Sequence, residues 1–413
     1  MPVQHRGQSL VTKARPFARA PGFLARRVAP AFERILNRID AALTSGVIHG
    51  TLPDGTPRIL GGRAPGFSCT VELRDYNALV RLASNGSVGW YQAWEASEWW
   101  SPDPVPLFAL FMQHAERLGD TARAKGVFRH ALKLAHLVNR NTHRGARQNI
   151  AAHYDLGNDF YAAWLDPTMS YSSALGPIGS DLEAAQRRKW AAMAERLGSA
   201  SSVLEIGCGW GGLADFLAAR GQQVTAISLS DAQLAWAKTH YGNGPEFLRQ
   251  DYRDVEGQFD AIVSVEMAEA LGRDYWPVFM DTLAQRLKPG GRAALQFISM
   301  RDDLFDAYAA SADFIQAYIF PGGLLIRTSE FRALAQARGL AWHDQHDFGI
   351  DYADTLRVWR ERFDAAIDAG TLPAGFDAHF CDLWRYYLMY CEGGFRGGGI
   401  DVHQVTLVKE TAK

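Results

Sequence analysis

A glycine-rich turn inside a regular alternation of strands and helices constrains this chain more than any other feature. The apolar run 202–206 leads into the segment 207–212, Gly-Cys-Gly-Trp-Gly-Gly, after which helical spacing begins. Glycines at such a turn let the backbone approach a ligand without a Cβ clash, and Glu205 can stay at the strand end. The pattern predicts a nucleotide-type ligand; the structural alternative is a turn needed only for tight helix packing.

Strands and helices alternate in the chain that follows this turn. Regular β-α-β alternation is typical of a doubly wound sheet with a mostly parallel core and right-handed crossovers, so we expect an α/β fold. The expected strands are 202–206, 223–227, 259–265 and 291–298, and the expected helices lie at about 211–220, 231–240 and 275–287.

The second strand favours one kind of nucleotide ligand. The segment 224–230 ends in hydroxyl side chains, where a dehydrogenase carries the acid that binds ribose. Farther along, Asp251 stands beside Tyr252, a carboxylate that can pair with an adenine amine next to a ring that can stack on the base. Together these features predict recognition of adenosine, in S-adenosylmethionine rather than in a dinucleotide.

The first thirty residues are basic. No acidic residue precedes Glu33, so residues 1–30 form either a disordered tail or an arm that docks on anionic lipid at roughly 1 kcal/mol per cation. The segment 31–139 is predicted to be a small α+β domain. Its expected elements are helices at 32–43 and 105–119 and a β-rich stretch at 47–100 that includes 69–73 and 89–91, and a linker at 139–149 leads into the second domain, 140–413.

Composition excludes several classes of protein. The 43 Lys and Arg against 45 Asp and Glu leave a net charge of -2, so no global basic field indicates nucleic-acid binding. No apolar run is long enough to cross a membrane, and the N-terminus lacks the pattern of a secretory signal. We expect a cytoplasmic protein without a metal site, because the four scattered cysteines have no metal-ligand spacing: Cys69, Cys208, Cys381 and Cys391.

Several sequence blocks, in order, resemble one family over most of the chain: the cyclopropane-fatty-acyl-phospholipid synthases and the related mycolic acid methyltransferases. The resemblance implies a class I methyltransferase fold, a Rossmann-like doubly wound sheet in 140–413 with a lipid-facing insertion, behind an N-terminal lipid-loading domain. The blocks are Ala-His-Tyr-Asp-Leu-Gly-Asn-Asp-Phe-Tyr at 152–161, Met-Ser-Tyr-Ser at 169–172, the glycine turn, Gln-Asp-Tyr-Arg-Asp at 250–254, Tyr-Ile-Phe-Pro-Gly-Gly at 318–323 and Phe-Gly-Ile-Asp-Tyr at 348–352.

The resemblance also implies the cofactor, S-adenosylmethionine, and the residues that line its site. By family match these are Tyr171, Ser172, Gly207, Gly209, Ser228, Leu229, Gln233, Tyr252 and Arg253. The role of His153 has two explanations. It either caps, with Asp155 and Asn158, the helix over the cofactor, or it takes part in catalysis. Apolar residues after the core of the sheet are either acyl-channel walls or ordinary core, namely Phe305, Phe314, Ile315, Tyr318, Ile319 and Phe320.

The implied reaction methylates the cis double bond of an unsaturated acyl chain in a phospholipid. Methyl transfer leaves a carbocation, and the base that removes a proton in this family is a bicarbonate ion held by a Glu, a His, a Tyr and backbone groups near a Cys. Glu269 and Tyr352 match two of these residues. Loss of a proton from the new methyl closes a cyclopropane, whereas loss from a neighbouring chain carbon leaves a methyl-branched alkene.

The chain departs from the family at the remaining catalytic positions. Ser173 stands in place of the Cys, Gln296 in place of the His, and Ala270 replaces a further His after the Glu. A backbone N–H of Ser173 can still make its contact, but an amide cannot become a cation that helps to hold an anion. Bicarbonate is therefore in doubt, and a methyl-branched, unsaturated chain is the favoured product, with a cyclopropane as the alternative. Without the family match, Glu269 is also explained as a solvated end group or a helix cap.

Other functions remain as alternatives. One alternative is methylation of a small diffusible molecule, but such a substrate would not require the extra N-terminal domain. The other is a catalytically inactive lipid-binding protein, against which the intact Gly207, Gly209 and Gln233 argue. The expected partners are unsaturated phospholipid acyl chains and, peripherally, the inner face of the membrane, with no nucleic acid. The family's tendency to self-associate implies a homo-oligomer.

Overall fold

The computed structural model describes residues 6–7, 10, 29–119, 156–179, 181–242, 244–311 and 313–411, so most of the basic segment 1–30 and the linker 139–149 lie outside the described residues. The chain divides into two compact units. The sequence analysis assigned 303–321 and 375–400 to the second domain, whereas the structure groups both with the first unit. Unit 1 comprises Met1–Val138, Asp303–Pro321 and Gly375–Ile400; unit 2 comprises Asn139–Asp302, Gly322–Ala374 and Asp401–Lys413.

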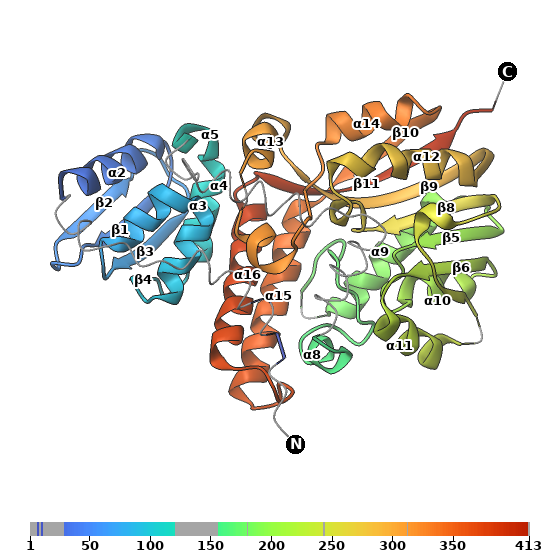
Figure 1. Ribbon diagram of the computed structural model, residues 1–413, viewed down its shortest axis with the longest axis horizontal. Helices are drawn as coiled ribbons and strands as arrows, with labels where there is room; N and C mark the ends of the chain where they lie inside the picture. The colour runs from blue at the N-terminus through green and yellow to red at the C-terminus, as the bar shows by residue number, and fades with distance from the viewer. Residues whose placement is uncertain are drawn as a thin grey trace. The chain divides into compact units, whose positions relative to one another are not determined.

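Unit 1 combines a four-stranded sheet with helices from three parts of the chain (Figure 1). The strand order is β2-β1-β3-β4, with β1 antiparallel to β2 and parallel to β3. The strands are β1 (Val47–Thr51), β2 (Pro57–Gly61), β3 (Ser68–Leu73) and β4 (Trp99–Trp100); the helices are α2 (Ala29–Ala42), α3 (Asn77–Glu95), α4 (Val105–Gln113), α5 (Ala115–Leu118), α13 (Asp302–Ala309), the π-helix η7 (Ile315–Ile319) and α16 (Ala378–Arg396).

The strand expected at 89–91 is wrong, because these residues lie in α3. Gly86 interrupts the helix with a φ of 59°, and a Cβ on Gly89 would lie 2.0 Å from the carbonyl oxygen of Arg81. The kink therefore brings the backbone too close for any side chain at Gly89. Trp90 and Tyr91 are buried there, so tertiary packing overrides the strand preference of aromatic residues.

An aromatic core holds unit 1 together. The ring of Tyr91 in α3 lies 4.9 Å from Phe314, 4.6 Å from Tyr318 and 5.0 Å from Tyr386 of α16. Phe305 and Ile319 are fully buried as well. Four of the six residues considered as acyl-channel walls are therefore buried in unit 1, a position that both interpretations drawn from the sequence allow.

Unit 2 contains the doubly wound sheet, and the expected α/β fold is confirmed. The strand order is β10-β11-β9-β8-β5-β6-β7, and β10 is antiparallel to β11. The strands are β5 (Ser202–Ile206), β6 (Gln223–Ser228), β7 (Glu246–Arg249), β8 (Phe259–Val265), β9 (Leu287–Met300), β10 (Leu340–Asp347) and β11 (Ile400–Lys409). The helices are α8 (Asn158–Ala162), α9 (Leu182–Arg196), α10 (Gly212–Ala218), α11 (Asp231–Tyr241), η4 (Tyr252–Asp254), η5 (Ala268–Ala270), η6 (Arg273–Tyr275), α12 (Trp276–Arg286), α14 (Thr328–Gln336) and α15 (Gly349–Asp368).

Helices cover both faces of this sheet. On one face, side chains of α9, α10 and α11 form a buried cluster with Val203 of β5 and Val263 of β8. On the other, Phe331 of α14 packs against Phe297 of β9 and Phe279 of α12. Burial on both faces explains why the strands are continuous apolar runs, and hence why the sequence predicted them well.

The connections of β5 determine where a ligand can bind. β5 pairs with β6 on one side and with β8 on the other, both in parallel. The chain runs outward through β6 and β7 and then returns to β8, so the strand order reverses beside β5 (Figure 1). Ligands of open α/β sheets bind at the carboxyl ends of the strands at such a reversal.

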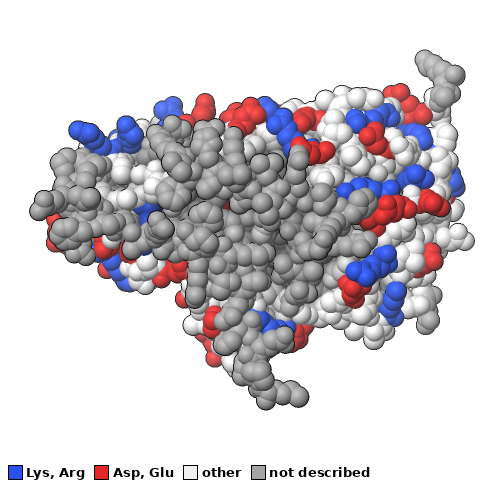
Figure 2. Space-filling view, viewed as in Figure 1, with Lys and Arg blue, Asp and Glu red and all other residues white. Residues whose placement is uncertain are grey.

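The visible surface has no single charge character. Figure 2 shows Lys and Arg interspersed with Asp and Glu over its coloured surface, in keeping with the net charge of -2. Among the described residues, no helix is both long and apolar enough to cross a membrane.

Candidate active site

The glycine turn after β5 is shaped by backbone conformations that favour glycine. Gly207, Gly209 and Gly211 have φ angles of 83°, 53° and 87°. A Cβ on Gly207 would lie 3.0 Å from the side chain of Met267, and one on Gly211 would lie 2.7 Å from the ring of Phe247. The turn therefore packs bare backbone against Met267, in the segment that follows β8, and against Phe247 of β7.

Two buried polar atoms, in segments that follow β6 and β7, have no hydrogen-bond partner among the described residues. Gln233 of α11 accepts a hydrogen bond from Ser228 Oγ at 3.3 Å, but its Nε2 atom is buried without a partner among the described residues. That atom lies 4.0 Å from where a Cβ of Gly209 would stand. The hydroxyl of Tyr252 in η4 is likewise buried and unpaired within the described part of the chain. Leu229, half-buried, follows the end of β6.

Residues of the 169–173 segment are held from two directions. Ser172 accepts hydrogen bonds from Lys189 Nζ at 2.6 Å, through its hydroxyl, and from Gln186 Nε2 at 2.9 Å, through its carbonyl. The ring of Tyr171 packs 5.4 Å from that of Trp359 in α15. Lys189 is fully buried, and this burial lowers its pKa to about 8 although nearby carboxylates act in the opposite direction.

Asp251 and Asn158, two residues of the family motifs, have partners in the structure. Both carboxylate oxygens of Asp251 accept hydrogen bonds from Arg253, at 2.8 and 2.6 Å. The carboxylate predicted to pair with an adenine amine thus forms an ion pair that orients Arg253. His153 and Asp155 lie outside the described residues; Asn158 accepts a hydrogen bond from Trp210 Nε1 at 2.9 Å and so fixes α8 to the glycine turn.

Glu266, the first residue after β8, is the centre of a second cluster, and the sequence analysis gave it no role. Its Oε1 accepts hydrogen bonds from Ser173 N at 2.9 Å and Gln296 Nε2 at 2.8 Å, and its Oε2 accepts one from Tyr352 OH at 2.7 Å. Three of the four predicted catalytic residues therefore meet on one carboxylate. Ser173 contributes its backbone N–H, because its hydroxyl donates to the carbonyl of Ala174.

A further amide fixes the orientation of Gln296. Gln404 of β11 donates from Nε2 to Gln296 Oε1 at 3.0 Å, and both residues are buried. Because the oxygen of Gln296 faces Gln404, its NH₂ group faces Glu266. No pattern in the sequence singled out Gln404; the available signal for Glu266 was an acid directly after a buried strand at the reversal of strand order.

Glu269, the fourth predicted catalytic residue, lies in η5 beside this cluster. One carboxyl oxygen accepts a hydrogen bond from Ile298 N, and the other is buried without a partner among the described residues. Its carboxyl group is therefore not a solvated end group. Burial, with the charge of Glu266 second, raises the pKa of Glu269 to about 8.

The two carboxyl groups have different hydrogen-bonding surroundings. Burial also raises the pKa of Glu266, but Tyr352, Lys189, Gln296 and Ser173 all oppose that rise. Both oxygens of Glu266 accept hydrogen bonds, which suits a carboxylate, whereas Glu269, with a pKa of about 8, is mostly protonated at neutral pH. Neighbouring carboxyl groups whose surroundings separate their pKa values are typical of sites that move protons.

Glu205, at the end of β5, is a third buried acid near the glycine turn. Burial raises its pKa to about 8, and the charge of Lys189 is the largest opposing influence. Its Oε2 atom is buried without a partner in the described part of the chain. The sequence analysis noted its position but assigned it no contact.

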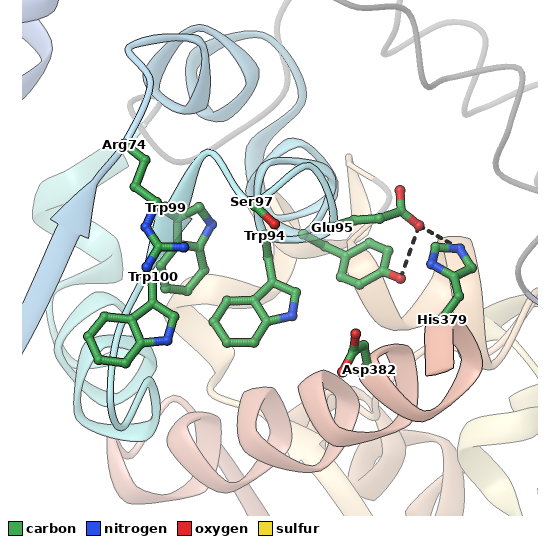
Figure 3. A pocket seen from close by; sticks show the side chains of 9 residues that line it. Arg74, Trp94, Glu95, Ser97, Trp99, Trp100, His379 and Asp382 are labelled. Atoms are coloured by element: carbon green, nitrogen blue, oxygen red, sulfur yellow. Dashed lines mark hydrogen bonds and ion pairs between the residues drawn. The ribbon is translucent and has the colours of Figure 1, made fainter. Parts of the chain in front are cut away.

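Two other groups of polar residues have simpler explanations. Figure 3 shows the unit 1 pocket, where Glu95 accepts hydrogen bonds from His379 at 2.8 Å and Tyr91 at 3.5 Å, so its polar groups already bind one another. In unit 2, His403 bridges Ser299 and Asp347, each at 2.6 Å. Ser299 and His403 are buried, and this chain links β9, β10 and β11.

The comparisons with known proteins agree with this geometry. A family model described as mycolic acid cyclopropane synthetase matches residues 141–405. The chain belongs to this family. A solved member, the mycolic acid cyclopropane synthase CmaA1 complexed with SAH and CTAB, has 27% identity and a TM-score of 0.60 and covers 64% of this chain and 98% of its own. The family resemblance and the cofactor, S-adenosylmethionine, are thereby confirmed.

Curated relatives extend over most of the chain. Tuberculostearic acid methyltransferase UfaA1 of Mycobacterium tuberculosis is 36% identical over 94% of this chain and 93% of its own length. The cyclopropane-fatty-acyl-phospholipid synthase of Escherichia coli strain K12 is 33% identical over 84% and 88%. The protein is therefore an S-adenosylmethionine-dependent methyltransferase of a lipid-modifying family.

Proposed function

We propose that this methyltransferase acts on the cis double bond of an unsaturated acyl chain in a membrane phospholipid and leaves a methyl-branched, unsaturated chain. The observation that carries the proposal is the carboxylate of Glu266, bound by Tyr352, Ser173 and the uncharged Gln296 at the carboxyl end of β8. The names of relatives that span most of the chain, a fatty acid methyltransferase and a phospholipid synthase, support a lipid substrate.

The residues around the glycine turn suit the cofactor. Gly207 and Gly209 leave backbone accessible, while Gln233 Nε2 and Tyr252 OH are buried groups that need a polar partner. Bound S-adenosylmethionine supplies an electrophilic methyl group. We propose that the predicted set holds it: Tyr171, Ser172, Gly207, Gly209, Ser228, Leu229, Gln233, Tyr252 and Arg253.

The reaction on the lipid requires a base in a dry site. The π electrons of the alkene would form the new C–C bond to the methyl group, the C–S bond of the sulfonium would break with its electron pair remaining on sulfur, and the adjacent chain carbon would become cationic. When a proton leaves a neighbouring chain carbon, the electron pair of that C–H bond forms a new double bond. An isolated alkene is a weak nucleophile, so the site must hold it in line with the methyl group. After the transfer, a buried carboxylate stabilises the cation.

Cyclopropane formation is the second candidate. It is favoured by the printed names of the Escherichia coli relative and of CmaA1. It requires loss of a proton from the transferred methyl group, whose carbon then closes the three-membered ring. The two candidate reactions therefore differ only in which carbon loses a proton to the base.

The proposal extends to how the protein meets its lipid substrate and to its oligomeric state. We propose that unit 1 loads the lipid, that the basic segment 1–30 contacts anionic head groups at the inner face of the membrane, and that the protein acts as a homo-oligomer. The basic residues of that segment support the second point, because each contributes roughly 1 kcal/mol near an anionic surface.

Isotope labelling tests the proposal. The protein is incubated with S-adenosylmethionine carrying a ¹³C²H₃ methyl group and with vesicles of oleoyl or cis-vaccenoyl phospholipid. Mass spectrometry then counts the deuterium atoms in the acyl chains, and ¹³C NMR identifies the labelled carbon. We expect a branched methyl group that keeps all its deuterium. A ring carbon that has lost one deuterium would make the protein a cyclopropane synthase, and acyl chains without label would overturn the lipid substrate.

A further inference from the structure

The three donors on Glu266 come from separate parts of the fold. Ser173 lies in the segment before α9, Gln296 in β9 and Tyr352 in α15. These are the positions at which the family resemblance expects bicarbonate to be held, with Glu269 as the fourth. In this protein the carboxylate of Glu266 already accepts the hydrogen bonds that such an anion would need.

A free anion does not fit beside Glu266. It would stand next to a negative charge, and the residue in the place of the family's His is an amide that cannot become a cation. A buried anion costs several kcal/mol unless charged or hydrogen-bonding groups hold it, and the donors of Ser173, Gln296 and Tyr352 already bind Glu266. The residues present therefore disagree with bicarbonate as the resident base.

The backbone at Glu266 indicates that the position is maintained for its side chain. Glu266 has a φ of 50°, in the left-handed region that glycine adopts freely and other residues rarely. Such a conformation costs on the order of 1 kcal/mol and persists where the surroundings enforce it, which is common at active sites. Here the backbone N–H of Glu266 donates to the carbonyl of Gln296 at 2.7 Å.

We propose that Glu266 is the catalytic base of this methyltransferase, a carboxylate built into the chain in place of a diffusible anion. The inference rests on the proposed function. After methyl transfer, the carboxylate takes the proton from a carbon beside the cationic centre, and the electron pair of that C–H bond becomes the new π bond. The resulting carboxylic acid returns its proton to water before the next turnover.

The groups facing Glu266 suit this role. Lys189 in α9 is the cation near it, Tyr352 in α15 and Gln296 in β9 are neutral donors, and Glu269 in η5 is the other acid. Glu266 is the carboxyl group with the most donors, whereas Glu269, whose pKa is raised to about 8, is mostly protonated at neutral pH. Glu266 is the first residue after β8, at the carboxyl edge of the sheet where ligands of open α/β folds bind.

Two substitutions test the base. Glu266→Gln keeps the size of the side chain and one of its two accepting oxygens, but an amide does not take up the proton. Glu266→Gly relieves the left-handed backbone and leaves three donors around an empty space. Glu246→Gln, an exposed change of the same kind in β7, is the matched control. For each variant we measure the melting temperature, S-adenosylmethionine binding by calorimetry, and label transfer to oleoyl vesicles.

We expect Glu266→Gln to bind S-adenosylmethionine as the wild type does and to lose at least about 100-fold in turnover, the range for removal of a general base. We expect formate, acetate or bicarbonate to restore turnover to Glu266→Gly in a saturable manner, and not to Glu266→Gln. Wild-type turnover by Glu266→Gln, or a folded Glu266→Gly that no carboxylate restores, would overturn the inference. Failure of the wild type to label lipid would instead overturn the proposed function.

Discussion

At the scale of single residues, the site depends on which atom of an amide faces a carboxylate. Gln296 donates to Glu266 because its oxygen is already bound by Gln404. The sequence indicated Gln296, Tyr352 and Ser173 through the family motif but not their common partner. Glu266 and Glu269 are three positions apart, and only the turn after β8 decides which carboxylate meets the donors.

Gln404 is therefore a positioning residue, and Gln404→Met tests it. Methionine has a similar length, and the substitution also removes a buried oxygen that has no partner among the described residues, so we expect folding to be retained. Loss of one hydrogen bond of about 1 kcal/mol that orients Gln296 should lower kcat several-fold. The KM for S-adenosylmethionine should not change. An unchanged kcat, or a change in KM alone, would contradict this role.

At the scale of elements, prediction succeeded where burial on both faces produces long apolar strands. β5 and β8 agree with the ranges expected from the sequence. It failed at 89–91, where the aromatic residues resemble a strand but belong to the kinked helix α3. The apolar pattern reports burial, whereas a close backbone approach such as that of Gly89 to Arg81 depends on residues that the local sequence does not reveal.

We expect the carboxyl group of Glu269, in the short helix η5, to make the stability of the protein depend on pH. Its pKa is about 8 in the folded protein, above the ordinary value of 4.5, so the folded state holds a proton that the unfolded state releases. The free energy of unfolding should therefore fall as pH rises from about 4.5 to 8, by up to about 1 kcal/mol per pH unit for each such group. Glu205 acts in the same direction.

Glu269→Gln should remove its share of this slope, because the amide has no proton to release. Urea denaturation at pH 5 and pH 8 measures the difference. We expect the variant to gain stability relative to the wild type at the higher pH, and the two proteins to be closer at pH 5. Parallel curves would mean that Glu269 is ionised in the folded protein.

At the scale of the whole molecule, the sequence predicted two domains but not their composition. Unit 1 recruits 303–321 and 375–400 from within the later part of the chain. Periodicity cannot assign such segments, because a buried aromatic helix has the same pattern whichever core it joins. The ring contacts of Tyr91 with Phe314 and Tyr386 join segments that lie far apart in the sequence.

The central claim for the whole protein is that it carries its own base. The most direct test is to compare label transfer by the wild-type protein to oleoyl vesicles in ordinary buffer and in buffer freed of carbon dioxide and bicarbonate. If Glu266 removes the proton, turnover should be the same in both. A loss of turnover on removing bicarbonate that added bicarbonate restores would contradict the claim.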